Sequence, residues 1–295
     1  MDCHEPLMSI DGLSVRVPEK ERIGGGAGDL TLVDRLSLRI RPGERVALVG
    51  ESGSGKSMTA RAVLQLDPHL RLSGSVRWKG QELVGSGERR MRTIRGREIS
   101  MIFQDPMTAL NPVLTIGEQV AETLTVHGMP KKKAYARAAE MLDRLRVPKA
   151  KERLRAYPGE FSGGMRQRVV MAAALVAGPD MLIADEPTTA LDVRVQEQVL
   201  DLLEEQSREL DLAVLFITHD LGIVAGLAHR VAVMLRGALV EERTVDDLFA
   251  CPRHPYTRGL MGSVPRLDAD PGIRLKTVAD HMSREGTMEG TTSHA

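Results

Sequence analysis

The residues at 50–57, GESGSGKS, have the types and spacing needed to bind phosphate groups. They match the pattern G-x-x-x-x-G-K-[ST], in which glycines let the chain turn tightly and aim backbone N–H groups at phosphate oxygens. Lys56 is expected to reach the β- and γ-phosphates of a nucleotide, and Ser57 to offer its hydroxyl to Mg²⁺. A chance glycine-rich turn is the alternative. The predicted contacts in this loop are Gly50, Glu51, Ser52, Gly53, Ser54, Gly55, Lys56 and Ser57.

Two adjacent carboxylates, Asp185 and Glu186, follow the short apolar stretch at 181–184. A nucleotide-bound Mg²⁺ needs a carboxylate at the end of a neighbouring strand, and hydrolysis needs a group that orients and deprotonates water. Asp185 is expected to hold the water shell of the metal. Glu186 points in another direction and is expected to face the attacking water. Two acids that merely end a strand are the alternative.

Ser162, Gly163 and Gly164 precede a predicted helix that starts near Met165. A helix N-terminus exposes backbone amides, and a serine there can cap them, so this position is a second candidate anion site. Taken alone, the pattern more often indicates an ordinary helix cap.

Strands and helices that alternate along the chain must position these groups. Such alternation predicts an α/β fold whose mainly parallel sheet is covered on both faces. A hairpin is expected over 230–241, turning at Arg236 and Gly237, and a loop over 24–28. Strands are predicted at 13–17, 32–40, 45–49, 181–184 and 213–217, and helices at 58–66, 166–177 and 193–210, with a polar helical region at 117–156.

The composition limits the remaining possibilities. Lys plus Arg and Asp plus Glu each number 40, and aromatic residues make up only 3%, which argues against a nucleic-acid-binding protein. Two cysteines exclude a disulfide framework within the 295 residues. The longest apolar run, 169–177, is far shorter than the roughly 20 residues that cross a bilayer. Because the N-terminus also lacks a signal-peptide pattern, we expect a cytoplasmic protein.

Several further motifs, in the expected order, resemble those of the ATP-binding cassette (ABC) family. FSGGMRQR at 161–168 is similar to the family signature, with Phe for Leu and Met for Gln. Phe103 and Gln104 resemble the Q-loop, Ala190 to Asp192 the D-loop, and His219 in ITHD the switch histidine. The resemblance implies a P-loop NTPase core with an N-terminal antiparallel β-subdomain and an inserted helical subdomain at about 105–165. The nucleotide-binding domain would span 7–262, and a tail 263–295.

The resemblance also implies roles for single residues. Two such domains would pair head to tail, with each ATP between the phosphate loop of one chain and the signature of the other. Glu186, His219 and Gln104 would be catalytic, His219 by contacting the γ-phosphate, although a buried histidine at a strand end is the alternative. Further nucleotide contacts would come from Gln104, Ser162, Gly163, Gly164 and Asp192, and Mg²⁺ would be held by Ser57, Gln104 and Asp185.

Three segments narrow the subfamily: MIFQDPMTALNP at 101–112, IADEPTTALDV at 183–193 and RHPYTRGLMGSVP at 253–265. They resemble the ATPases of dipeptide, oligopeptide and nickel importers. Such an ATPase would lie on the cytoplasmic face of the inner membrane with a second ATPase subunit, two permeases and, indirectly, an extracytoplasmic binding protein. Without the resemblance, His254 to Tyr256 is read as an ordinary turn.

Alternatives remain open at this point. They are an importer of nickel or another small solute, a soluble cassette ATPase acting on DNA or ribosomes, and an inactive subunit of a heterodimer. The eight scattered histidines show no metal-ligand spacing. Two positions depart from the family pattern: Val17 stands where an aromatic residue usually stacks on adenine, and Gly159 where the subfamily usually has histidine.

Overall fold

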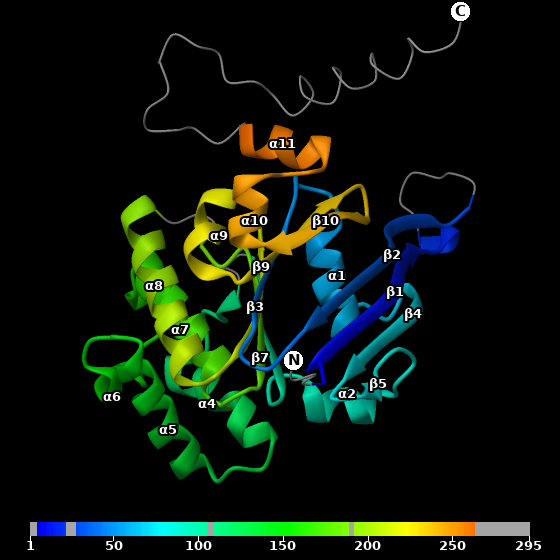
Figure 1. The fold of residues 1–295 in the computed structure, drawn as a ribbon. Helices are drawn as coiled ribbons and strands as arrows, with labels where there is room; N and C mark the ends of the chain where they lie inside the picture. The colour runs from blue at the N-terminus through cyan, green and yellow to red at the C-terminus, as the bar shows by residue number, and fades with distance from the viewer. Residues whose placement is uncertain (1–4, 22–27, 105–108, 189–191, 263–295) are drawn as a thin grey trace, which may run out of the picture.

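The computed structural model describes residues 5–21, 28–104, 109–188 and 192–262, which form two sheets surrounded by helices (Figure 1). The smaller sheet is antiparallel, with the strand order β2-β1-β4-β5. Its strands are β1 (Met8–Val17), β2 (Leu30–Ile40), β4 (Arg71–Trp78) and β5 (Gln81–Glu82).

The larger sheet has the order β10-β9-β3-β8-β7-β6 and is parallel except for the β9–β10 hairpin. Its strands β7 and β8 are buried at every position, as expected for parallel strands covered on both faces. The strands are β3 (Arg45–Val49), β6 (Ile99–Ile102), β7 (Met181–Asp185), β8 (Ala213–Thr218), β9 (Arg230–Leu235) and β10 (Ala238–Thr244).

Local sequence signals explain where several helices begin. The Thr115 hydroxyl accepts a hydrogen bond from Glu118 N, and the Glu118 carboxylate accepts one from Thr115 N, which makes a capping box at the start of α4. The described helices are α1 (Lys56–Val63), α2 (Glu88–Ile94), α4 (Ile116–Val126), α5 (Lys131–Arg144), α6 (Ala150–Arg153), α7 (Gly163–Leu175), α8 (Val193–Glu209), α9 (Leu221–Leu227), α10 (Val245–Ala250) and α11 (Pro255–Gly262), with single 3₁₀ turns η1 (Glu19–Glu21) and η2 (Pro158–Glu160).

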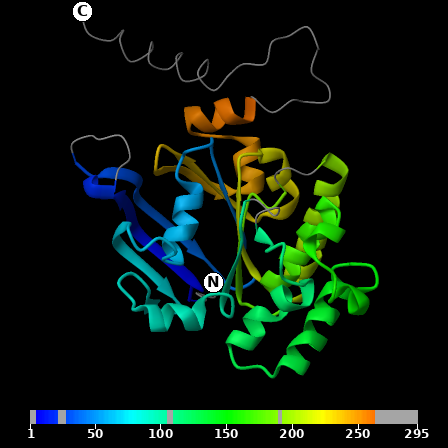
Figure 2. The same ribbon diagram turned by 180° about the vertical axis from the view of Figure 1, so that it is seen from behind.

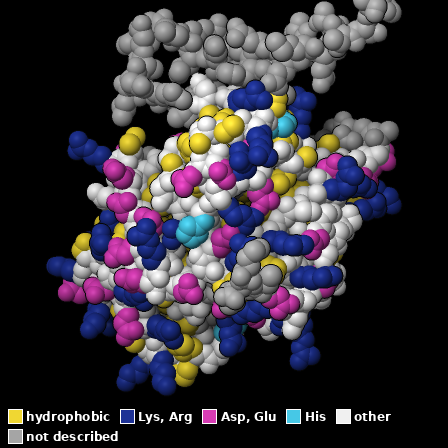
Figure 3. Space-filling model, in the orientation of Figure 1, with side chains coloured by type: hydrophobic (Ala, Val, Ile, Leu, Met, Phe, Trp, Pro, Cys, Tyr) yellow, Lys and Arg dark blue, Asp and Glu magenta, His cyan; other side chains and the backbone are white. Residues whose placement is uncertain are grey.

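The large sheet separates two hydrophobic clusters. Alternate residues of β3 face opposite sides, so that Ala47 and Val49 join one cluster while Val46 and Leu48 join the other. In both ribbon views, α4 to α8 lie on one side of the molecule and α1 with the antiparallel sheet on the other (Figures 1 and 2). On the face shown in Figure 3, acidic and basic side chains are interspersed. Because β3, β6, β7, β8 and β9 run parallel in one sheet, their C-terminal ends lie at the same edge of that sheet.

Most predicted elements are confirmed, including the parallel strands and the turn at Arg236 and Gly237. The helix expected from Met58 already begins at Lys56, and the reading of His254 to Tyr256 as an ordinary turn is wrong because Pro255 opens α11. The predicted inserted segment contains α4, α5, α6 and η2 among its described residues. Most of the predicted glycine loop, the D-loop residues Ala190 and Leu191, and the tail 263–295 lie outside the described residues. Within the described ranges, no helix combines the length and apolar character that a membrane span requires.

Candidate nucleotide-binding site

The phosphate loop, residues 50–57, connects the end of β3 to the start of α1. Gly55 has a φ of 106°, and a Cβ built there would lie 2.6 Å from the Leu32 carbonyl oxygen, so this position requires glycine. The turn of the β9–β10 hairpin supports the loop, because Gly237 N donates to the Ser54 carbonyl over 2.9 Å. The loop thus packs closely against β2 and is hydrogen-bonded to the hairpin.

Lys56 is buried with 5% of its surface exposed. Its Nζ donates to the carbonyl oxygens of Gly50 (2.7 Å) and Glu51 (2.8 Å). Burial lowers the pKa of Lys56, and the nearby carboxylates of Glu186, Asp185 and Glu51 oppose that effect. A phosphate that enters the loop supplies the negative charge that a buried ammonium group needs.

Asp185 ends β7 and is also buried. It accepts a hydrogen bond of 2.9 Å from the Ser57 hydroxyl. Burial raises the pKa of Asp185, while the hydrogen bond from Ser57 opposes the rise. Carboxylate and hydroxyl oxygens are ligands suited to Mg²⁺, which usually keeps waters and binds substrate phosphates as well. The donor set therefore fits the predicted ion.

Glu186 follows Asp185 with a φ of 46°, in the left-handed region, and its N–H donates to the Ile217 carbonyl of β8 over 2.8 Å. Its carboxylate accepts a hydrogen bond of 3.0 Å from Gln104 Nε2, and His219 Nδ1 lies 3.1 Å from its other oxygen. The side chain of His219 is 62% exposed, so the alternative of a buried histidine is wrong. Three predicted catalytic residues are therefore in direct contact.

The loop and this carboxylate face one cavity of ≈ 650 Å³. Part of its lining, the residues from β2 and the β9–β10 turn, was not predicted from the sequence. No local signal marks them, because only the tertiary packing brings them to the loop. Val17 pairs in register with Leu30, which lines the cavity and is 44% exposed. The cavity is lined by Leu30, Thr31, Leu32, Ser52, Gly53, Gly55, Lys56, Ser57, Met58, Gln104, Glu186, Arg236 and Gly237.

The signature and Asp192 lie outside the lining of this cavity. The Ser162 hydroxyl accepts from Met165 N (3.4 Å) and caps α7, and Asp192 accepts from Val195 N (3.0 Å) and caps α8. The two helix starts pack closely, because a Cβ on Gly164 would lie 2.5 Å from a methyl carbon of Val195. The predicted residues thus form two groups, one at the cavity and one at these helix starts.

A second cavity of ≈ 300 Å³ lies beside Gln104. Its lining comes from β6, α4 and α7 and from the segments that follow α1, α2 and β6, and it includes Phe103, which is 43% exposed. The lining is mostly apolar but also includes the polar side chains of Arg95, Gln119 and Glu122. Phe103 of this groove directly precedes Gln104, the residue that contacts Glu186.

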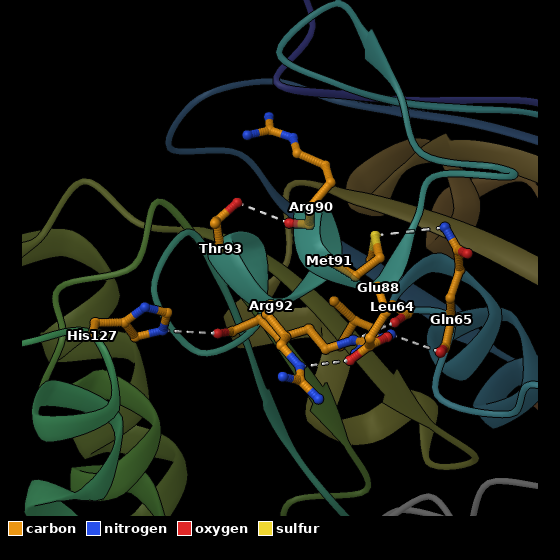
Figure 4. A network of polar contacts seen from close by, with 9 residues as sticks. Leu64, Gln65, Glu88, Arg90, Met91, Arg92, Thr93 and His127 are labelled. Atoms are coloured by element: carbon orange, nitrogen blue, oxygen red, sulfur yellow. Dashed lines mark hydrogen bonds and ion pairs between the residues drawn. The ribbon is translucent and has the colours of Figure 1, made fainter.

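Arg95 lines the groove and binds the end of the loop's helix. Among its partners, Leu64, Gln65, Glu88 and His127 are labelled in Figure 4. The Arg95 guanidinium donates to the carbonyls of Leu64 and Gln65, both over 2.8 Å, and to Glu88 over 2.8 and 3.0 Å. His127 Nε2, at the end of α4, lies 3.4 Å from the Arg95 carbonyl oxygen. Arg95 therefore connects the C-terminal end of α1 with α2 and α4.

The model of the ABC transporter family matches residues 33–189. The chain belongs to this family. A second model, described as the oligopeptide/dipeptide transporter C-terminal region, matches residues 240–290 of this ABC protein. The expected family and fold are confirmed, and the chain is an ABC-type ATPase.

Individual relatives agree with this assignment. The chain is 49% identical to the oligopeptide transport ATP-binding protein OppD of Salmonella typhimurium, over 85% of this chain and 75% of the relative. It is 51% identical to the dipeptide transport ATP-binding protein DppD of Bacillus subtilis, over 82% and 73%. A dimeric structure of the cassette MJ0796 in a post-hydrolysis state with ADP and Pi has a TM-score of 0.69 and 26% identity, over 81% of this chain and 98% of that one.

Proposed function

We propose that this ATPase drives an importer of dipeptides or oligopeptides. Support comes from the match of residues 240–290 to the oligopeptide/dipeptide transporter C-terminal region, and from the relatives named for peptide transport. Neither of these relatives is named for nickel, and neither is named for a role on DNA or ribosomes. The peptide importer is therefore preferred over those alternatives.

The phosphate loop binds the triphosphate in this proposal. Its amides and the ammonium group of Lys56 hold the β- and γ-phosphates, and the positive end of α1 points at them. Leu30, exposed at the rim of the cavity, offers the adenine ring an apolar contact in place of the aromatic residue absent at Val17. Mg²⁺ would be held by Ser57, Asp185 and Gln104, and when bound it neutralises charge on the phosphates.

Glu186 acts as the general base for hydrolysis. It takes a proton from a water that attacks the γ-phosphorus, the bond to the β–γ bridging oxygen breaks, and ADP and phosphate result. The observation that carries this assignment is the placement of the carboxylate between Gln104 and His219, on the same cavity as Lys56. The two contacts fix both carboxylate oxygens, and the exposed part of the His219 side chain can meet the γ-phosphate.

A second ATPase subunit and the permeases are the partners of this chain in the proposal. Because the helix starts at Ser162 and Asp192 lie outside the cavity of their own chain, we assign Ser162, Gly163, Gly164 and Asp192 to the nucleotide of a second ATPase subunit. The groove beside Gln104 receives a permease, which keeps the chain at the cytoplasmic face of the inner membrane. A permease segment bound at Phe103 lies next to Gln104, which contacts Glu186. A movement of Gln104 on ATP binding is therefore transmitted to the permease.

Reconstitution tests the proposal. The chain is assembled in vesicles with two candidate permeases. Their binding protein is added on the side of the membrane opposite the ATPase, and uptake of a labelled tripeptide or of nickel is measured. ATP-dependent uptake of the tripeptide, lost in Glu186→Gln, is expected. Uptake of nickel alone, or peptide uptake that does not depend on this chain, would contradict it.

A further inference from the structure

Tyr256, within the segment His254 to Thr257, contacts the phosphate loop directly. Tyr256, in the first turn of α11, has only 1% of its surface exposed. Its hydroxyl accepts a hydrogen bond of 2.9 Å from the backbone N–H of Glu51, 205 residues earlier in the chain. α11 itself lies at the edge of the molecule, beside the clustered hydrophobic side chains near α10 (Figures 1 and 3). The C-terminal part of the described chain is thus connected to the second residue of the loop.

The position of the Tyr256 hydroxyl is fixed by the sheet. The Glu241 carboxylate on β10 is buried and accepts hydrogen bonds from Arg253 N (2.8 Å) and His254 N (2.9 Å). His254 Nδ1 then accepts from Tyr256 N over 3.2 Å, at the start of α11. The ring of Tyr256 belongs to the main hydrophobic cluster. Tyr256 therefore has little freedom to move away from the loop.

The hydrogen bond from Glu51 N involves the same peptide group that Lys56 binds. The N–H of Glu51 and the C=O of Gly50 belong to one planar unit, so fixing one group fixes the other. Tyr256 holds the N–H, and Lys56 Nζ donates to the C=O over 2.7 Å. When Lys56 turns toward a phosphate, its contacts with the loop carbonyls weaken, and Tyr256 still holds this peptide.

We propose that Tyr256 is a positioning residue of the phosphate loop, which raises the affinity for nucleotide by holding the Gly50–Glu51 peptide as Lys56 engages the phosphates. The inference rests on the nucleotide binding proposed above. Because Tyr256 touches no reacting atom, it affects the bound substrate and the transition state equally. Its loss therefore changes KM and the dissociation constant, with little change in kcat.

The test compares Tyr256→Phe with Leu260→Val in the full 295-residue chain. The first variant removes only the hydroxyl and keeps the ring. The second shortens another buried side chain of the same helix and is the control for disturbed packing of α11. Binding of Mg·ADP is measured by calorimetry, the unfolding temperature by scanning fluorimetry, and kcat and KM for ATP in vesicles with the permeases.

Tyr256→Phe is expected to weaken Mg·ADP binding and raise KM by about two- to tenfold, the range of one net hydrogen bond, with kcat nearly unchanged. Leu260→Val should leave binding unchanged, even where its unfolding temperature falls below that of the parent. The inference is overturned if Tyr256→Phe binds Mg·ADP as the parent does, or if both variants weaken binding equally. A parent protein that bound no nucleotide would instead refute the proposed function, together with this inference.

Discussion

The substitution Glu186→Gln tests the assignment of the general base. Glutamine keeps the size of the side chain and one oxygen that can accept from Gln104 or His219, but it cannot take a proton from water. A positioned general base contributes about 10²- to 10⁴-fold in rate. Since each tenfold corresponds to about 1.36 kcal/mol, the loss in activation free energy is about 3 to 5 kcal/mol.

Binding of ATP should change much less in this variant. Burial lowers the pKa of Lys56, and the Glu186 carboxylate is one of the charges that oppose this effect. Removing that carboxylate therefore lowers the pKa of Lys56 further, which weakens its hold on phosphate. It also removes a negative charge that repels phosphate. The two effects oppose each other, so the dissociation constant should stay near that of the parent.

The assay is steady-state phosphate release by the reconstituted complex, together with calorimetric titration of ATP into the isolated variant. Glu197→Gln is the matched control, because it makes the same chemical change at an exposed position of α8. We expect the control to keep the parental rate. Equal rates for Glu186→Gln and the parent would remove Glu186 from the mechanism, and a loss of ATP binding would show that its role is structural.

Three further substitutions, the first with a matched control, probe the site and its support. Gly164→Ala places a Cβ 2.5 Å from Val195 and should destabilise the fold by about 1 to 3 kcal/mol, whereas Gly159→Ala, with open space around it, should not; thermal unfolding distinguishes them. Ser57→Ala should raise the Mg²⁺ concentration for half-maximal turnover by at least about tenfold, and an unchanged Mg²⁺ dependence would refute the assigned ligand. Asp67→Asn should cost about 1 kcal/mol or less at pH 7, because a hydrogen-bonded arginine lowers the pKa of this carboxyl on folding. This difference in the free energy of unfolding between parent and variant is fully present above the pKa of an aspartate in the unfolded chain, about 3.9. It should vanish as the pH falls through the lower pKa of Asp67 in the folded protein, and unfolding curves from pH 7 to 2 test it.

Features set by short segments were predictable from the sequence. The strand at 45–49 and the loop after it combine a compact apolar run with a specific glycine pattern, and both occur where expected. The apolar run before Asp185 likewise predicts the end of β7. The contact of Glu186 with Gln104 and His219 depends on parallel strands that end at the same edge of the sheet. The predicted parallel α/β fold implies such an arrangement.

Contacts between distant segments were not predictable. Tyr256 and Glu51 are separated by 205 residues, and no pattern in either segment indicates that one meets the other. The proline at 255 suggests a turn, yet the same residue is well suited to the first helical position, where its missing N–H costs nothing. Leu30 and the Arg236 turn also reach the cavity through packing of β2 against the hairpin.

The binding and turnover of ATP by Lys56→Ala test the central claim most directly. Lys56 is buried, donates to two carbonyls of the loop and lines the cavity that we assign to the phosphates of the nucleotide. The variant should remain folded, lose most of its affinity for Mg·ATP and show no measurable hydrolysis with its permeases. If Lys56→Ala bound and hydrolysed ATP as the parent does, the assignment of this cavity to the nucleotide would be wrong.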